Sequence, residues 1–457
     1  MKRLYPSPVY IMAAIVLAPC AAEAQVLPNV TGPLNDVAGD TLREQRLQEL
    51  AERRARRLEA EAAEAVEDTA DVVDEVVEPA TDTVASAAGE ATGAVAGALR
   101  TFTSAAAPDG SQIEADVLVA LLDADDVETL RAAGYGILAE RDMQNLGRVM
   151  VTLEVPAGID LDGELGRLRG ALTGASLDYN HLYRWDAAEA GAPEVPATDA
   201  TASVPADDSR LRIGVIDSAV QVDHRALRDV HVEARDFVTH NAKRPETHGT
   251  AVASLVARSA GDDVIVYSAS VFFEMEGYAP GASTEGLVAA LDWLAGQEVD
   301  VINMSLSGPG NDLLEAAVGA VLESGQTVVA AVGNEGPSSP PRYPAAYDGV
   351  IGVTAVDRKE RVFRAANRGE HVDFAALGVD VKVADSTTGS YRLASGTSMA
   401  SPHIAVVAAR LLREGDVARD ALESWLIAGA EDLGRRGFDP VYGHGLVTRV
   451  PMVAASD

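Results

Sequence analysis

The chain has 457 residues and a formal net charge of −33 at pH 7, and its length predicts two or three domains at roughly 150 residues each. The acid excess argues against a nucleic-acid partner, which would need a basic face to neutralise phosphates, and it favours solubility. The single cysteine is Cys20, which excludes a disulfide scaffold, a cysteine-rich zinc site and a thiol nucleophile in the body of the protein.

Residues 1–24 have the composition of a signal peptide. A lysine and an arginine follow the first residue, residues 9–22 are almost entirely apolar, and the pattern Ala-Glu-Ala at the end is typical of a cleavage site. The apolar run is shorter than the roughly 18 residues that a spanning helix needs, so a membrane tether is not favoured. Residues 17–20 are similar to a lipoprotein box with a proline in place of a small residue, which leaves lipidation as an alternative. We expect export to a bacterial periplasm or to the extracellular space.

Residues 25–109 are expected to form a low-complexity, partly helical, acidic and Ala-rich region. Leucines at helical spacing lie among dense Arg and Glu between residues 41 and 64, and an Ala/Gly/Ser/Thr-rich run follows Pro79. A solvated spacer is the favoured interpretation. A weak helix that contacts a partner or a membrane is the alternative.

Residues 110–185 predict a small α+β domain. Strands and helices alternate in the order β-α-β-β-α-β, which is the order of a ferredoxin-like unit. Residues 186–208 are rich in Ala, Pro, Thr and Asp, and we expect a linker that contains a processing site. The expected strands of the unit are 116–122, 136–138, 148–155 and 175–183, and the expected helices are 125–133 and 161–172.

Residues 209–457 predict an α/β domain built on a parallel sheet. Near-continuous apolar runs are separated by helical segments, which indicates strands buried on both faces and helices on both sides of the sheet. In such sheets the functional side chains gather at the carboxyl ends of the strands. The expected strands are 211–216, 264–271, 299–304, 327–332 and 350–355, and the expected helices include 283–296 and 312–324.

Two candidate functional residues stand at the ends of these elements. Asp217 directly follows a strand, so its carboxylate is expected at the edge where sites form. His248 opens an apolar helical run, and the next residue, Gly249, lets other groups approach the imidazole closely. The structural alternatives are a turn cap for the aspartate and a buried histidine without a role in catalysis.

Two more candidates complete the set. Ser398 lies in a Gly-Thr-Ser turn that leads into a long apolar helix, where the first N–H groups would stabilise a developing oxyanion. Asn334 follows another buried strand and could donate its carboxamide N–H to the same oxyanion. The alternatives are a helix N-cap for the serine and a turn residue for the asparagine. Together, in the chain order Asp, His, Ser, the signals favour a serine hydrolase.

The motifs around these residues resemble those of the subtilisin family of serine peptidases. VIDSAV, HGTAVAS, AVGNEG and GTSMASPH are similar to the family's Asp, His, oxyanion-Asn and nucleophile motifs, and the similarity covers residues 209–457. The resemblance implies a subtilisin-like fold and a secreted serine endopeptidase that acts on polypeptide substrates. It also implies that the segment of Ser305, Leu306, Ser307 and Gly308 pairs with the substrate backbone.

The resemblance extends to residues 110–185, which look like the pro-domain of secreted subtilisins. This unit is therefore expected to be an intramolecular inhibitor and folding assistant of a zymogen. Ala219 and Ser307 replace glycines that are usual in the family, and we expect these changes to alter subsite shape rather than chemistry. No cofactor is expected. We recognise no intact calcium-loop signature, and calcium dependence stays open.

In the expected mechanism, His248 takes the proton of Ser398 while Asp217 orients the imidazole and stabilises its charged form. Asn334 and the backbone N–H of Ser398 would hold the oxyanion. The main alternative is a catalytically silent subtilisin-like binding module. An esterase is less favoured, because Ala400 breaks the G-x-S-x-G pattern. The sequence does not predict cleavage specificity.

Overall fold

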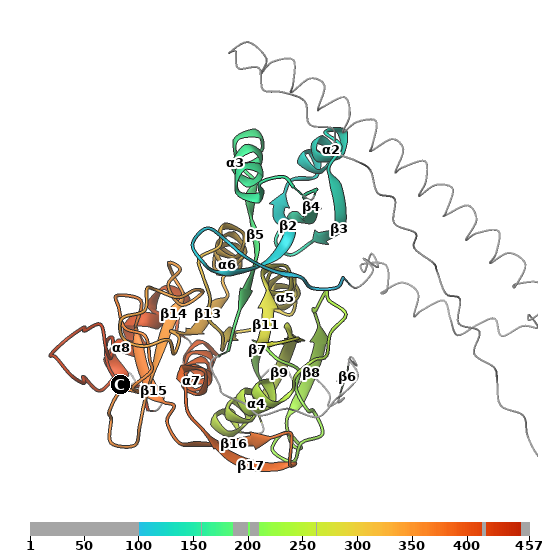
Figure 1. Cartoon of the computed structure of the whole chain (residues 1–457). Helices are drawn as coiled ribbons and strands as arrows, with labels where there is room; N and C mark the ends of the chain where they lie inside the picture. The colour runs from blue at the N-terminus through green and yellow to red at the C-terminus, as the bar shows by residue number, and fades with distance from the viewer. Residues whose placement is uncertain are drawn as a thin grey trace, which may run out of the picture. The chain divides into compact units, whose positions relative to one another are not determined.

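A computed structural model of the protein describes residues 100–156, 158–185, 200–201, 210–261, 263–413 and 417–448. All of these residues belong to one compact unit of the chain, Val77–Asp457, and Figure 1 draws them in colour. The predicted signal peptide, most of the low-complexity region and most of the linker lie outside the described residues. Within the described ranges, no helix has both the length and the apolar character needed to cross a bilayer.

The first part of the described chain is an antiparallel sheet with two helices. Four strands lie in the order β5-β2-β4-β3, and apolar side chains of these strands and of the two helices form one buried cluster. The elements follow the predicted ferredoxin-like order, so this part of the predicted fold is confirmed. The elements are β2 (Gln112–Leu122), α2 (Ala124–Ala132), β3 (Gly136–Met143), β4 (Arg148–Glu154), α3 (Leu161–Ala171) and β5 (Ser176–Tyr183).

This sheet begins earlier in the chain than the sequence indicated. A short strand, β1 (Ser104–Ala106), pairs antiparallel with β2. Arg100 forms an isolated parallel bridge with His240, far along the chain. The sequence analysis placed residues 100–109 in the low-complexity region, because a short Ala-rich strand gives no alternation of apolar and polar residues.

The second part of the chain is built on an eight-stranded sheet in the order β15-β14-β13-β12-β7-β9-β8-β6. Neighbouring strands are parallel except for β6 and β8. The strands in the middle of the sheet are buried along their whole length, which explains their near-continuous apolar sequences. The strands are β6 (Ala200–Thr201), β7 (Leu211–Asp217), β8 (His231–Asp236), β9 (Val264–Ser270), β12 (Val301–Met304), β13 (Thr327–Ala331), β14 (Ile351–Val356) and β15 (Phe374–Leu377).

Helices cover both faces of this sheet, as predicted. On one face α4 (Thr247–Ala260) and α7 (Ser401–Arg413) pack against each other and share a hydrophobic cluster with the strands. On the other face α5 (Thr284–Gly296) and α6 (Asp312–Glu323) do the same with a second cluster. The predicted fold class, a parallel sheet with helices on both faces, is confirmed.

Several smaller elements were not predicted. Besides the sheet strands β6, β8 and β15, these are two antiparallel hairpins and three short helical segments. The hairpins carry charged and exposed residues, so their sequences lack a buried-strand pattern. They are β10 (Phe272–Met275) with β11 (Tyr278–Ser283), β16 (Val381–Asp385) with β17 (Ser390–Ala394), η1 (Thr397–Met399), η2 (Arg419–Ala421) and α8 (Leu422–Gly429).

Strand β5 belongs to both parts of the chain. On one side it pairs with β2, and on the other it pairs antiparallel with β11, with Tyr183 opposite Ala282. The antiparallel sheet therefore continues without a break from the ferredoxin-like unit into the second part, and Figure 1 shows β11 and β5 next to each other. This pairing holds the end of β5 against the larger domain.

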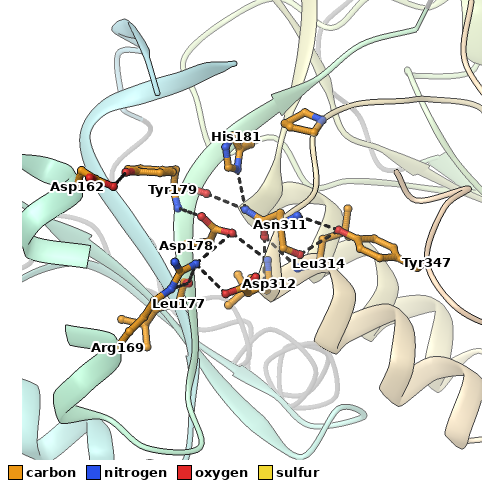
Figure 2. A network of polar contacts seen from close by, with 12 residues as sticks. Asp162, Arg169, Leu177, Asp178, Tyr179, His181, Asn311, Asp312, Leu314 and Tyr347 are labelled. Atoms are coloured by element: carbon orange, nitrogen blue, oxygen red, sulfur yellow. Dashed lines mark hydrogen bonds and ion pairs between the residues drawn. The ribbon is translucent and has the colours of Figure 1, made fainter. Parts of the chain in front are cut away.

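Polar side chains of β5 also bind the start of α6, as Figure 2 shows. Asp178 accepts a hydrogen bond from the backbone N–H of Asp312 at 2.9 Å. Asn311, the N-cap of α6, donates through Nδ2 to the carbonyl of Tyr179 at 3.0 Å and to Nδ1 of His181 at 2.9 Å. Because the first N–H groups of a helix lack partners within the helix, these contacts fix β5 against the helix start.

Candidate active site

Asp217 and His248 meet at the carboxyl end of β7. Asp217 is the last residue of this strand, His248 is the second residue of α4, and both side chains are buried. Nδ1 of His248 lies 2.8 Å from Oδ1 and 3.0 Å from Oδ2 of Asp217. A carboxylate at Nδ1 holds the proton on that nitrogen, so Nε2 is the acceptor of the neutral imidazole. This pair can act as an oriented general base.

Short hydrogen bonds join the end of β7 to the start of α4. The backbone N–H of Ser218 donates to Oδ1 of Asp217 at 2.6 Å, and the N–H of Gly249 donates to Oγ of Ser218 at 2.7 Å. A Cβ on Gly249 would lie 2.1 Å from the carbonyl oxygen of Ser218 and 2.7 Å from that of Ala219. Glycine after the histidine is therefore what allows the helix to begin so close to the strand.

Ser398 lies in η1, the turn that precedes α7, and is 3% exposed. The turn packs against α4, so the serine and the histidine come from neighbouring elements. Oγ of Ser398 donates a hydrogen bond to the carbonyl oxygen of Ser305 at 3.1 Å. The hydroxyl is thus at the start of the predicted substrate-pairing segment.

Asn334 lies in the loop after β13 and contacts the residue next to Ser398. Its Oδ1 accepts hydrogen bonds from both N and Oγ1 of Thr397, each at 3.1 Å. With its oxygen held there, the carboxamide turns its NH₂ group away from Thr397. The four predicted residues are therefore drawn from two strand ends, one helix start and one turn.

The segment Ser305–Gly308 follows β12, and its backbone is paired with two other parts of the chain. Ser307 exchanges two hydrogen bonds with Arg184, of 3.0 Å to the carbonyl of Ser307 and 2.9 Å to that of Arg184. Gly308 exchanges two with Tyr343, of 2.9 and 3.0 Å. Leu306, which precedes Ser307, is buried. The predicted substrate-pairing edge therefore pairs with the residue that follows β5.

The sequence analysis missed an aromatic residue in the site. The indole of Trp185 stacks on the imidazole of His248, with ring centroids 5.2 Å apart and planes at 6°. Phe272 lies on the indole as well, at 4.3 Å and 55°. The available signal was the pair Tyr183 and Trp185, two aromatic residues two apart at the end of a strand and directly before a linker without aromatic residues.

A buried charged cluster lies where residue 100 meets the second part of the chain. The guanidinium of Arg100 binds both Glu114 and Glu285, at 3.1 and 2.5 Å, and Nε2 of His240 lies 3.1 Å from Glu114. Burial alone would raise the pKa of Glu114, but hydrogen bonds and charges of His240 and Arg100 lower it to about 2. The opposite charges of this cluster compensate one another, and none of its residues is a triad candidate.

In the ranges that the structure describes, no group of three or more His, Cys, Asp or Glu side chains is arranged to hold a metal ion.

Comparison with known proteins assigns the second part of the chain to a family. Residues 208–445 match the model of the subtilase family, Peptidase_S8. Subtilisin DY from Bacillus licheniformis is 32% identical over 250 residues, which are 52% of this chain and 89% of that protein. The minor extracellular protease Epr from Bacillus subtilis (strain 168) is 31% identical over 247 residues, and the match spans 52% of this chain but only 37% of that protein.

A solved structure agrees in fold. Fervidolysin from Fervidobacterium pennivorans, described as a keratinolytic enzyme related to subtilisin, matches with a TM-score of 0.58 and 19% sequence identity. The match covers 77% of this chain and 63% of fervidolysin, which is a larger share of this chain than residues 208–445 supply. At this identity the likeness concerns the fold alone. The family match, with the subtilisin relatives, shows that the chain belongs to the subtilase family and is a subtilisin-like serine endopeptidase.

Proposed function

We propose that this protein is a secreted serine endopeptidase that cleaves polypeptides through an acyl-enzyme, with Asp217, His248 and Ser398 as its catalytic triad. The observation that carries the proposal is the buried contact of 2.8 Å between His248 Nδ1 and Asp217 Oδ1 beside the turn of Ser398. A buried carboxylate at Nδ1 leaves Nε2 as the base for a neighbouring hydroxyl.

Acylation begins when Ser398 Oγ attacks the carbonyl carbon of the scissile peptide bond. The hydroxyl turns about one side-chain bond from the carbonyl of Ser305 to Nε2 of His248, which takes its proton. The carbonyl oxygen becomes an oxyanion, held by the NH₂ group of Asn334 and the backbone N–H of Ser398. When the C–N bond breaks, His248 returns the proton to the leaving amine, and the acyl group stays on Oγ.

Deacylation repeats these steps with water. His248 takes a proton from the water, the resulting hydroxide forms the new C–O bond, and the proton returns to Oγ of Ser398 as the ester breaks. Asp217 remains ionised throughout and stabilises the imidazolium. The products are a carboxylic acid and an amine, so atoms and charge balance with the side chains and water alone, and the proposed chemistry includes no cofactor.

The test is replacement of the nucleophile. Ser398→Ala is expected to abolish hydrolysis of casein and labelling by a fluorophosphonate probe, because both require an activated hydroxyl. The matched control is Ser395→Ala in the same loop, whose Oγ accepts a hydrogen bond from the N–H of Asp380 at 2.9 Å and which is not assigned to the chemistry. Labelling of Ser398→Ala at the wild-type level would refute the proposal.

The same probe decides against the alternative. A catalytically silent subtilisin-like binding module would leave Ser398 unlabelled in the wild-type protein, although the protein is folded. The buried Asp217–His248 contact favours the enzyme, because a binding surface has no need of a desolvated carboxylate–imidazole pair.

We also propose that residues 110–185, together with the short strand β1 that precedes them, are the inhibitory pro-domain of a zymogen. Support comes from the pairing of Arg184 with Ser307 and the cover of Trp185 on His248, which occupy the segment and the base that a substrate needs. The protein should cut itself after this unit, within the predicted linker. Sizing of wild-type and Ser398→Ala products expressed in parallel tests this. Equal processing of the variant would assign the cut to another protease.

Export completes the proposal. Residues 1–24 supply the signal-like sequence, and the relative named as a minor extracellular protease supports it. Mapping the N-terminus of the protein recovered from the medium or the periplasm tests whether the chain is cut after residue 24.

A further inference from the structure

We infer that the cleft selects substrates by two aromatic side chains two residues apart, in the pattern Tyr-x-Trp, and cuts one residue beyond the Trp. The inference rests on the proposed peptidase function and names its substrate class. It is carried by Tyr183, the last residue of β5, and by the two residues that follow it, Arg184 and Trp185.

The main chain of these residues is held as the middle strand of three. Tyr183 lies opposite Ala282 of β11 on one side, and Arg184 exchanges two hydrogen bonds with Ser307 on the other. Backbone pairing on both edges is how extended peptides add to sheets, with side-chain pockets supplying the selectivity. The segment therefore shows how a substrate of the same sequence would lie.

The tryptophan site is lined by two rings of the larger domain. Trp185 is 7% exposed, with the His248 imidazole parallel to its indole at 5.2 Å and the Phe272 ring at 4.3 Å. His248 gains a proton in each transition state of the proposed mechanism. An indole face within about 6 Å of a cation stabilises it, so a substrate Trp would stabilise the transition state more than the ground state.

The tyrosine site is formed by a glycine and a carbonyl. Tyr183 is fully buried, and its hydroxyl donates to the carbonyl of Pro309 at 3.1 Å. A Cβ on Gly308 would lie only 2.3 Å from the Tyr183 ring, so the ring packs directly on the backbone. A methyl group on Gly308 would therefore close this site to an aromatic side chain.

Arg184 provides a contrast, because the hydrogen bond of its side chain stays within its own part of the chain. Its guanidinium hydrogen-bonds to Gln112 of β2, within the ferredoxin-like unit. In a short peptide this partner is missing, and the arginine is expected to contribute through its backbone only.

The position of the cut follows from the strand register. Residues two apart on one antiparallel strand face residues two apart on the other, so the substrate residue two beyond the arginine pairs with Ser305. The carbonyl of Ser305 is the group that Ser398 Oγ contacts. In the chain's own sequence that residue is Asp186, outside the described residues, and the bond to be cut is Asp186–Ala187.

The experiment uses the wild-type enzyme after self-processing, with active sites counted by a fluorophosphonate probe and casein as a general substrate. The substrate is an internally quenched peptide of residues 181–190, His-Leu-Tyr-Arg-Trp-Asp-Ala-Ala-Glu-Ala. It is compared with the peptides Trp185→Ala, Trp185→Leu and Tyr183→Ala. Arg184→Ala is the matched control, and mass spectrometry identifies the cut.

We expect cleavage between Asp186 and Ala187. Trp185→Leu keeps an apolar side chain without the indole face, so kcat should fall about two- to thirtyfold, and Trp185→Ala should lose at least as much. Tyr183→Ala should lower kcat/KM by about tenfold or more, and Arg184→Ala should stay within about twofold. In the enzyme, Gly308→Ala should remove the preference for tyrosine. Gly319→Ala, whose new Cβ meets nothing within 4 Å, should keep it.

Two results would overturn the inference. If casein is cut and Ser398 is labelled, but all five peptides react within about twofold or at another bond, the cleft does not select this pattern and the peptidase function stands. If neither casein nor the probe reacts, the proposed function is wrong and the inference is lost with it.

Discussion

At the scale of single residues, the site depends on groups whose orientation is fixed by a neighbour. The carboxylate of Asp217 takes both the His248 Nδ1 and the N–H of Ser218, so neither it nor the imidazole can turn without breaking a buried contact. Asn334 is fixed in the same way by Thr397. Such preorganisation is what makes a small number of donors effective in a desolvated site.

Asn334→Ala should lower kcat while the fold and KM change little. The lost NH₂ group would act on the oxyanion, which exists only in the transition state and the intermediates. In subtilisin itself, loss of the equivalent donor costs about 10²–10³ in kcat, and that magnitude is taken from this relative rather than derived for the present chain. Steady-state kinetics with circular dichroism as the folding control measure the effect. Unchanged kcat would remove Asn334 from the oxyanion hole.

At the scale of elements, the start of α4 against the end of β7 sets the geometry of the base. The N–H of Gly249 on Ser218 and the N–H of Gln221 on Thr250 join the loop after β7 to the first turn of the helix. The helix thus begins at a position defined by the strand, and this position fixes where the imidazole of His248 lies.

Gly249→Ala should destabilise this junction. Its Cβ would lie 2.1 Å from the Ser218 carbonyl oxygen, so backbone must move, at a cost of about 1–3 kcal/mol in the free energy of unfolding and with a loss of kcat. Gly319→Ala within α6 is the control, and is expected to gain up to about 1 kcal/mol. Urea unfolding in the Ser398→Ala background compares the two. Equal stability of both variants would contradict this account of the glycine.

How far the sequence predicted the elements depends on their pairing. Strands buried on both faces, such as β9 and β13, and helices such as α6 were found to within a few residues, because their apolar pattern is local. The β10–β11 hairpin was not, since its strands pair with each other and with β5 across distant sequence. The same holds in the site: motifs mark Asp217 and Ser398, whereas the contact of Trp185 with His248 is a property of the folded chain.

At the scale of the whole molecule, the ferredoxin-like unit and the larger domain share a polar interface around β5 and α6. Asn180 connects the ferredoxin-like unit to α5 as well. Its Oδ1 accepts the N–H of Glu285 in α5 at 3.1 Å, and its Nδ2 donates to Glu114 in β2 at 2.7 Å. Two helix starts thus donate hydrogen bonds to alternate residues on one face of a strand, Asp178 and Asn180.

Acid should weaken this interface through His181. Burial lowers the pKa of His181 from 6.5 to about 4, against the charges of Asp109 and Asp312, which raise it, while Arg169 lowers it further. Its Nδ1 accepts the Asn311 N–H, a bond that protonation removes. Because the folded protein binds fewer protons than the unfolded chain between pH 6.5 and about 4, its stability falls as the pH falls through that window, by at most about 1.4 kcal/mol per pH unit.

The measurement is the unfolding temperature of full-length Ser398→Ala protein between pH 7.5 and pH 4.5. Adding His181→Gln should flatten this dependence, and adding His231→Gln on the partly exposed strand β8 should leave it as it is. An identical slope with and without His181 would show that other groups govern the response to acid.

In the proposed zymogen, the pairing of β5 with β11 means that cutting the chain beyond β5 does not by itself free the active site. After a break beyond Trp185, the severed piece would still be paired with β11 through the end of β5 and with Ser307 through Arg184, with an indole on the imidazole. Dissociation or digestion of that piece would then determine when substrate turnover begins. A culture would show a delay between the appearance of the shortened chain and the appearance of peptidase activity. The first molecule that loses its severed piece could digest the severed pieces bound to other molecules. The peptidase activity of the culture should therefore rise abruptly and autocatalytically.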